Sequence, residues 1–212
     1  MITVGIDCGN RNTKAIVLFD GKVEGKAITL TDFNPKEAAL KAYETALKEA
    51  GLKKDQVAAI ASTGVGRNQV GFTKGLLTEA GSAARGARFV NPHANTVIDL
   101  GAEGSRAVRL STDGTVDKFA ANDKCATGGG AFVETIARAL QVKPEEMGPL
   151  SLQHTKVLSM NAQCVVFAES EVISLIHQKT NPEDIAHAVH EGLANRISGI
   201  VRRVGLIDDI VL

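Results

Sequence analysis

The sequence has few cysteines, no excess of either charge and no long apolar run. Its 212 residues include only three cysteines, Cys8, Cys125 and Cys164, which is too few for a disulfide framework. Lysine plus arginine and aspartate plus glutamate both number 24, so the formal net charge is zero. A zero net charge offers no basic footprint for nucleic acid and no polybasic patch for a membrane surface.

No run of about 18 apolar residues predicts a membrane span, and the N-terminus lacks the charged and apolar regions of a signal peptide. We therefore expect a cytoplasmic protein with neither nucleic acid nor a membrane among its partners. Hydrophobic residues make up 44% of the chain and charged residues 23%. This composition is typical of a globular protein that buries a core.

Apolar periodicity and turn residues predict an α/β protein with two similar lobes. In the first half we expect strands over 2–8, 13–19, 23–30 and 57–62 and helices over 35–50 and 72–84. In the second half we expect strands over 95–100, 105–110, 115–120 and 210–212 and helices over 131–140, 165–177 and 182–204. Each half thus begins with a strand-strand-strand-helix unit, which predicts a first lobe over 1–88 and a second over 89–212.

An internal repeat links the starts of the two lobes. The stretch GIDCGNRNTKAIVL, residues 5–18, has the same layout as VIDLGAEGSRAVRL, residues 97–110. In each copy an aspartate ends a strand, a glycine follows two residues later, and a cation follows seven residues after the aspartate. These residues are Asp7, Gly9 and Lys14 in the first copy and Asp99, Gly101 and Arg106 in the second.

This combination suits a polyphosphate. Glycine lets backbone N–H groups approach an anion closely, the cation neutralises it, and the aspartate holds Mg²⁺ directly or through water. We predict Asp7 and Asp99 as the catalytic pair, with Gly9, Asn10, Lys14, Gly101 and Arg106 binding ATP or ADP. The alternative is that each copy is only a tight hairpin that needs glycine, but repetition in register favours a nucleotide site.

The repeated loops resemble the superfamily of acetate kinase, sugar kinases, Hsp70 and actin. That resemblance implies duplicated RNase H-like lobes with a nucleotide cleft between them. It leaves kinase, chaperone and ATP-driven switch open, because fold alone does not decide function.

Two cysteines stand directly before predicted helices. Cys125 precedes the glycines Gly128, Gly129 and Gly130 and a helix, within NDKCATGGGAFVETIARAL; Cys164 precedes another helix, within NAQCVVFAESEVISLI. N–H groups and the helix dipole at such a position favour a thiolate and any anionic centre bound to it. We therefore predict Cys125 and Cys164 as metal ligands and the three glycines as cofactor-binding residues. The alternative is a pair of small buried cysteines, with glycines that only open a helix.

A four-iron four-sulfur cluster usually needs four thiolates, and two such cysteines in one chain cannot supply them. A twofold dimer supplies four. Cys8, within the first repeated loop, is expected to pack rather than to bind iron.

The cysteine motifs, together with STGVGRN, residues 62–68, resemble the BadF/BadG/BcrA/BcrD ATPase family along essentially the whole chain. These are the activators of 2-hydroxyacyl-CoA dehydratases and the ATPase subunits of benzoyl-CoA reductase. The resemblance implies that Cys125 and Cys164 ligate one four-iron four-sulfur cluster shared between two subunits. It also implies an ATPase that takes electrons from a ferredoxin-like donor and drives them into an acyl-CoA reductase or dehydratase partner.

The chain departs from the family pattern at three places, of which Asn10, where the family often has serine, is the smallest change. Activators carry Gly-Gly-Gln-Asp after the second-lobe aspartate, whereas this chain reads Gly101-Ala102-Glu103-Gly104, which is more like the D-type subunit of benzoyl-CoA reductase. Family members also continue past the strand matching 210–212 into a Gly-Gly turn that contacts adenosine, so we expect the second lobe to lack its C-terminal part.

Two other functions stay open from the residues. A small-molecule kinase of the same fold would leave Cys125 and Cys164 without a role. A non-catalytic regulatory subunit that binds nucleotide weakly would fit the altered second loop. The mate in a dimer is either an identical chain or a paralogous subunit.

Overall fold

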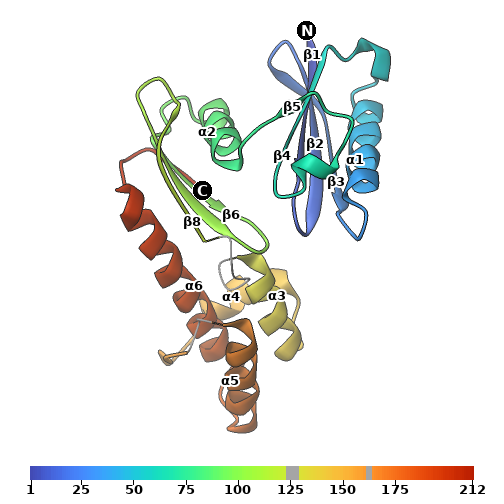
Figure 1. The fold of residues 1–212 in the computed structure, drawn as a ribbon. Coiled ribbons are helices and arrows are strands. Elements are labelled where there is room, and N and C mark those ends of the chain that lie inside the picture. Colours follow the sequence, from blue (N-terminus) through green and yellow to red (C-terminus); the bar gives the residue numbers. More distant parts are fainter. Residues whose placement is uncertain (123–128, 161–163) are drawn as a thin grey trace. The chain divides into compact units, whose positions relative to one another are not determined.

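The computed structural model describes residues 1–122, 129–160 and 164–212. The chain divides into two compact units, Met1–Ala83 and Ala84–Leu212 (Figure 1). Each unit contains its own sheet, and each has its own buried apolar core. Within the described residues, no helix combines the length and the hydropathy needed to cross a membrane.

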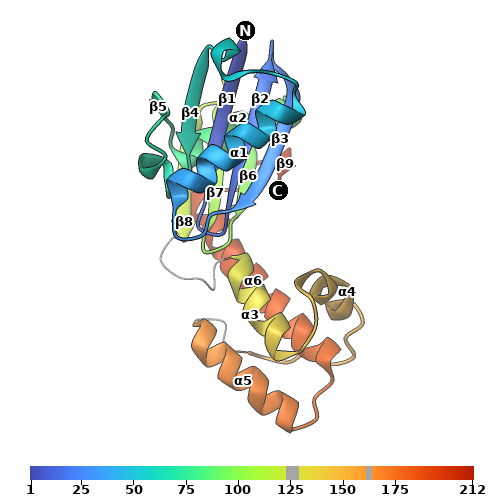
Figure 2. The same cartoon turned by 90° about the vertical axis from the view of Figure 1, so that its right-hand side faces the viewer.

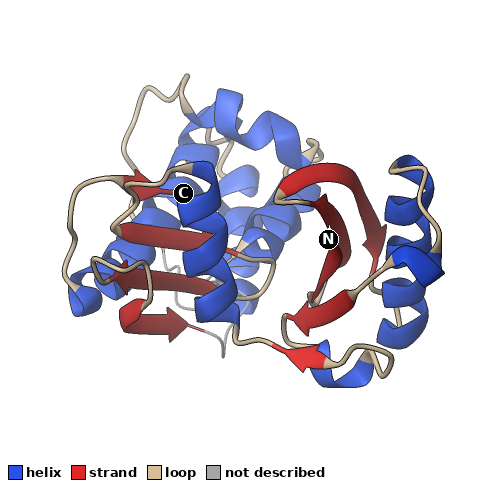
Figure 3. Ribbon diagram, turned by 90° about the horizontal axis from the view of Figure 1, so that it is seen from above, coloured by secondary structure: helices blue, strands red, loops and turns tan. Residues whose placement is uncertain are grey.

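The first unit is a five-stranded sheet with one helix packed on it. Its elements are β1 (Ile2–Cys8), β2 (Asn12–Phe19), β3 (Lys22–Leu30), α1 (Pro35–Glu49), the 3-10 helix η1 (Lys54–Gln56), β4 (Ala59–Thr63), the 3-10 helix η2 (Arg67–Gln69) and β5 (Gly75–Leu76). The strand order is β3-β2-β1-β4-β5, with β1 antiparallel to β2 and parallel to β4. Figure 3 shows α1 lying along one face of this sheet.

Local sequence explains where α1 begins and what it buries. The Asn34 side chain accepts a hydrogen bond from the Glu37 N–H, and Pro35 occupies the first turn, which together favour a helix start. Tyr43 and Leu47, one turn apart, face the sheet and pack with Ile6 and Val17 in the first core.

The second unit repeats the strand arrangement. Its elements are β6 (Thr96–Leu100), β7 (Ser105–Leu110), β8 (Val116–Asn122), α3 (Gly130–Ala139), the 3-10 helix η4 (Pro144–Glu146), α4 (Met147–Ser151), α5 (Val165–His177), α6 (Pro182–Val204) and β9 (Ile210–Val211). The strand order is β8-β7-β6-β9, with β6 antiparallel to β7 and parallel to β9. The relation of β6 to β7 and β9 therefore matches that of β1 to β2 and β4.

The helices of the second unit depart from a simple repeat. A helix does follow the third strand, as predicted over 131–140, but the C-terminal half of α6 is the helix packed on the sheet, through Ile200 and Val204 against Ala107. Helices α3, α4, α5 and the N-terminal half of α6 form a separate helical cluster with its own core, which includes Phe132 and Val172 (Figure 2). We call this group the helical cluster below.

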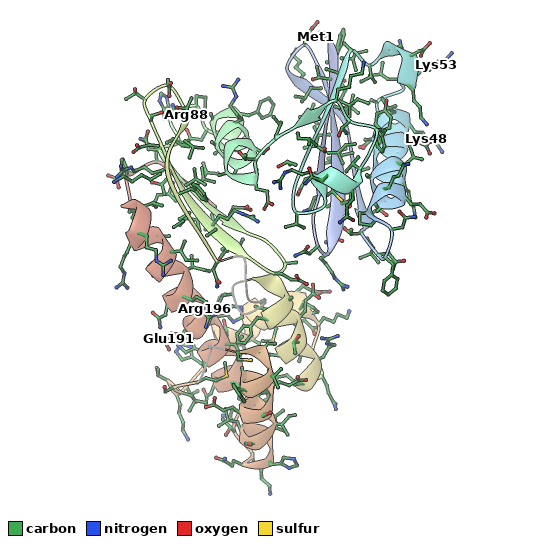
Figure 4. All side chains as sticks on the ribbon, in the orientation of Figure 1. Met1, Lys48, Lys53, Arg88, Glu191 and Arg196 are labelled. Carbon is green, nitrogen blue, oxygen red and sulfur yellow. The ribbon has the colours of Figure 1, made fainter. Side chains whose placement is uncertain are left out.

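The helix predicted over 72–84 is wrong in position. The structure has β5 at Gly75–Leu76, parallel to β4, and the helix α2 is Glu79–Val90. The helix begins there because the Thr78 hydroxyl accepts a hydrogen bond from the Gly81 N–H, as an N-terminal cap. At its other end, Arg88 (labelled in Figure 4) donates to the carbonyl of Ser111 and so ties α2 to the second sheet.

Candidate functional site

The first repeated loop is the turn between β1 and β2, which we call the first hairpin. Asp7 and Lys14 are directly opposite in the antiparallel pair, and Lys14 Nζ donates to Asp7 Oδ2 over 2.9 Å. The turn closes with a hydrogen bond from the Gly9 N–H to the Asn12 carbonyl, 3.2 Å. A Cβ on Gly9 would lie 2.8 Å from that carbonyl oxygen, so the turn needs glycine. Asn10 lies exposed in the turn.

The second repeated loop is the turn between β6 and β7, which we call the second hairpin. Asp99 and Arg106 are directly opposite, and Arg106 Nη1 donates to Asp99 Oδ2 over 3.0 Å. The Gly101 N–H donates to the Gly104 carbonyl over 2.8 Å, the equivalent of the bond that closes the first hairpin. The repeat in the sequence is therefore also a repeat in strand register and in hydrogen bonding.

The carboxylate of each acid–cation pair is partly exposed, although Arg106 in the second pair is only 14% exposed. The side chains of Asp7 and Asp99 are each 40% exposed. Ion pairs at such positions contribute from about zero to 1 kcal/mol to stability. What the pairs do provide is a carboxylate and a cation held side by side next to a glycine turn, the arrangement that a magnesium-bound polyphosphate requires.

A glycine loop of the first unit packs against the first hairpin. Gly64 has φ of +87°, and a Cβ there would lie 2.5 Å from Asp7 Oδ1 and 2.4 Å from the Cys8 carbonyl oxygen. The Gly66 N–H donates to the same carbonyl over 2.9 Å, and Arg67 Nη1 donates to the Gly64 carbonyl over 3.0 Å. The STGVGRN stretch thus packs closely against the first hairpin at Asp7 and Cys8.

The second hairpin is supported by the start of α3 instead. The N–H groups of Gly130 and Ala131 donate to the carbonyls of Gly101 and Ala102, over 3.0 and 2.9 Å. A Cβ on Gly129 would lie 2.3 Å from the Gly101 carbonyl oxygen, so a glycine is needed for this close approach. Gly129 and Gly130 therefore contact the second hairpin, and any contact with a nucleotide stays a prediction. Gly128 lies outside the described residues.

The predicted iron ligands lie in the second unit. Cys164 is the N-cap residue of α5, is half-buried, and makes no capping hydrogen bond with its side chain. This position fits a thiolate ligand, because the helix start favours negative charge and the residue is not fully buried. Cys125 lies outside the described residues. Among the residues that the structure describes, no three side chains of metal-ligating type converge, so a cluster would need ligands from beyond them.

Cys8 packs in the first core, as expected. Its side chain is fully buried, and burial is the main cause that raises the pKa of its thiol. Its sulfur lies 3.7 Å from the Thr13 hydroxyl and 3.9 Å from the Pro35 carbonyl. A buried thiol of this kind is typical of a packing residue.

Sequence reasoning missed two parts of the site. Gly64 lies within the STGVGRN motif, but its separation from Asp7 along the chain hides the contact between them. Thr31, whose hydroxyl donates to the Gly9 carbonyl over 2.7 Å, has no local signal at all, because the bond joins the end of β3 to a turn 22 residues earlier.

Comparison with known proteins agrees with these features. The model of the BadF/BadG/BcrA/BcrD ATPase family matches residues 4–212. The activator of lactoyl-CoA dehydratase of Anaerotignum propionicum is 37% identical over 216 residues, which cover 100% of this chain and 82% of the relative. A benzoyl-CoA reductase component of Thauera aromatica, of the D type, is 35% identical over 219 residues, which cover 100% of this chain and 76% of the relative.

A solved structure extends the comparison to the fold. The activator of the 2-hydroxyisocaproyl-CoA dehydratase from Clostridium difficile, with bound ADPNP, superposes with a TM-score of 0.91 at 30% identity. The match covers 99% of this chain and 78% of that one. The α/β actin-like ATPase fold expected from the sequence is thereby confirmed.

Proposed function

Because the chain belongs to the BadF/BadG/BcrA/BcrD ATPase family, we propose that it is an ATP-dependent electron-transfer component of an acyl-CoA reductase or dehydratase system. The observation that carries the proposal is the pair of hairpins with the same register, glycine turn and acid–cation pair. A glycine turn beside an acid–cation pair suits the binding of a magnesium-bound polyphosphate.

In this proposal each hairpin is a phosphate-binding element for ATP. Lys14 and Arg106 neutralise phosphate charge, and the turns at Gly9 and Gly101 let backbone groups approach the phosphate oxygens. Asp7 and Asp99 would hold Mg²⁺ directly or through water, and the bound ion would supply neutralisation of phosphate charge during hydrolysis. The Clostridium difficile activator with bound ADPNP supports nucleotide binding by this chain.

Calorimetric titration with Mg²⁺ and AMPPNP tests the nucleotide site. We expect Asp7→Ala and Asp99→Ala each to weaken binding by about 1–3 kcal/mol, because each removes a charged contact. Asp55→Ala, at an exposed position of η1 in the first unit, is the matched control and should leave the affinity unchanged. Unchanged affinity in both hairpin variants would show that the phosphate assignment is wrong.

We propose further that Cys125 and Cys164 of two chains hold one four-iron four-sulfur cluster. One chain offers two of the four thiolates, and a second copy or a paralogous subunit supplies the others. When bound, the cluster supplies the one-electron redox change that ATP hydrolysis by itself does not provide. The start of α5 at Cys164 would orient N–H groups toward this anionic centre and favour its reduced form.

The surface of α5 supports an interface at this position. Val166 and Phe167, in the first turn after Cys164, are 62% and 66% exposed, and Ile173 and Ile176 are also exposed. At 3.6 residues per turn Val166, Phe167 and Ile173 fall on the same side of α5, and exposed apolar side chains gathered in this way form a patch that typically marks a contact with another protein. We propose that a second chain covers this patch and brings its own cysteines to the cluster.

A continuous path joins the second hairpin to Cys164. Gly130 and Ala131 at the start of α3 are hydrogen-bonded to the hairpin, and α3 packs on α5 through Phe132 and Val172 in the core of the helical cluster. A shift of the hairpin on ATP binding or hydrolysis would therefore move α3 and, through this core, the helix that begins at Cys164. The nucleotide can drive such a change only if it binds the two states unequally.

Native mass measurement under anaerobic conditions tests the assembly. We expect a dimer that contains the cluster and that loosens when a chelator removes iron. A monomer that keeps a complete four-iron cluster would contradict the shared site, because all four ligands would then lie within one chain. The proposed external partners are a ferredoxin-like electron donor and the acyl-CoA reductase or dehydratase that receives the electron.

A further inference from the structure

Thr31 follows β3 directly, and two of its groups donate hydrogen bonds to the first hairpin. Its hydroxyl donates to the Gly9 carbonyl over 2.7 Å, and its backbone N–H donates to the Arg11 carbonyl over 3.1 Å. These two bonds lie on either side of the exposed Asn10. Thr31 therefore holds both ends of the short segment that we assign to the phosphates.

The hydrogen-bond directions around Thr31 can be worked out. Its single hydroxyl proton is used in the bond to Gly9, so the Thr31 oxygen can only accept in the 3.1 Å contact with the Thr13 hydroxyl, whose one proton is shared between this oxygen and Cys8 Sγ at 3.7 Å. Thr13 is fully buried and Thr31 is 5% exposed. Bonds in such a place are shielded from water, and their loss leaves the Gly9 carbonyl without this partner.

In the second hairpin a backbone N–H, and not a side-chain hydroxyl, donates to the equivalent glycine carbonyl. The carbonyl of Gly101, the equivalent of Gly9, accepts from the backbone N–H of Gly130 instead of a hydroxyl. The residue equivalent to Thr13 is Ser105, whose buried hydroxyl has no hydrogen-bond partner within the described part of the chain. In both hairpins the glycine carbonyl is thus fixed, but only in the first does a single side-chain hydroxyl do it.

We propose that Thr31 is a positioning residue that sets the conformation of the first hairpin for phosphate binding; this inference rests on the proposed function. A carbonyl fixed on the Thr31 side orients the peptide groups of the turn and therefore the shape that the turn presents to a phosphate. Without the hydroxyl the turn samples other conformations, and the nucleotide must then restrict it on binding. The expected consequence is weaker nucleotide binding by a chain that is otherwise folded.

The test compares Thr31→Val and Thr31→Ala, which lack the hydroxyl, with Thr31→Ser, which keeps it. We expect the first two to raise the dissociation constant for Mg²⁺-AMPPNP about three- to tenfold, which is the loss of one buried hydrogen bond, and Thr31→Ser to restore it. The matched control is Thr29→Val, two residues earlier on β3 and half-buried. It should bind the nucleotide like the unmodified chain.

The rise in Tm on adding the nucleotide separates positioning from a merely structural role. A structural role would lower the Tm without nucleotide and leave the nucleotide-dependent rise unchanged, whereas weaker binding reduces the rise. Unchanged affinity in a folded Thr31→Val or Thr31→Ala chain would overturn the proposal. So would failure of both to fold, since the hydroxyl would then hold the fold and not the hairpin.

The variants Asp7→Ala and Asp99→Ala distinguish failure of the Thr31 proposal from failure of the proposed function. If Asp7→Ala and Asp99→Ala leave Mg²⁺-AMPPNP binding unchanged, the nucleotide site itself is wrong. If they weaken binding while both hydroxyl-free variants of Thr31 bind normally, only the role of Thr31 is wrong.

Discussion

The two hairpins are alike in what they present and different in what supports them. Asp7 with Lys14 and Asp99 with Arg106 have the same strand register, and both aspartates are equally exposed. The first hairpin is held by Thr31 and packs against the loop at Gly64, both within a small unit that has one covering helix. The second is held by the start of α3, which belongs to the helical cluster.

This difference indicates that the two units have different roles. We propose that the two hairpins are alike because each of them binds phosphate. The supports differ because only the second hairpin is joined, through α3 and α5, to the position of Cys164. We infer that the first unit mainly holds the nucleotide and the second also transmits its state.

A substitution that disrupts the packing of the Gly64 loop on the first hairpin should cause the largest loss of stability. In Gly64→Ala the new Cβ meets Asp7 Oδ1 and the Cys8 carbonyl, and the backbone has φ of +87°. We expect a loss of about 2–4 kcal/mol in the free energy of unfolding, from the left-handed backbone and from overpacking together. Urea denaturation measures it. Gly86→Ala, on α2 with open space at its Cβ, is the control and should not destabilise.

Breaking the support of the second hairpin should cost less in stability. Gly129 has an extended backbone that any residue adopts, so Gly129→Ala suffers only from crowding against the carbonyls of Gly101 and Ala102. We expect a loss of about 1–3 kcal/mol in urea denaturation. Gly148→Ala, on α4 with open space, should match the unmodified chain. If Gly129→Ala is equally harmless, the contact between α3 and the second hairpin does not hold.

Low pH should destabilise the helical cluster, because it protonates one carboxylate, that of Asp184. Backbone N–H groups of Lys156 and Thr155 donate to Asp184 at the start of α6, and these bonds hold the pKa of that carboxyl below its ordinary value. A lowered pKa in the folded chain means that this contribution is full above the ordinary aspartate pKa of about 3.9 and is lost as the pH falls below it.

Hydrogen exchange can follow this effect in each unit. We expect amides of the helical cluster to lose more protection than those around α1 when the pH falls from about 5 to about 3. In Asp184→Asn the cluster should show reduced protection already at pH 5, with a smaller further change in acid. The same pH response in Asp184→Asn as in the unmodified chain would contradict this role.

Local signals account for the parts of the fold that could be predicted. The hairpin register follows from a carboxylate and a cation seven residues apart across a short turn, and α1 follows from Asn34, Pro35 and its apolar stripe. The start of α2 also has a local signal, because Thr78 followed by Glu79 is a common helix start. The apolar residues just before Thr78 favour an earlier start and so mislead the prediction.

The rest depends on contacts between distant residues. Nothing local distinguishes α3, which joins the helical cluster, from α6, whose C-terminal half packs on the second sheet. The support of Gly9 by Thr31 and of Gly101 by Gly130 likewise arises only once the chain has folded. Sequence pattern therefore indicates the residues proposed to touch the ligand better than those that hold them in place.

Iron content is the most direct test of the central claim, that ATP-binding hairpins serve a cluster shared between two chains. The protein is purified without oxygen, together with a paralogous subunit if it has one, and iron, sulfide and visible absorption are measured per dimer. We predict about four irons per dimer for the unmodified chain and for Cys8→Ser, and loss of the cluster in Cys164→Ser and Cys125→Ser. A colourless, iron-free dimer after reconstitution, or a cluster unchanged in Cys164→Ser, would contradict the account.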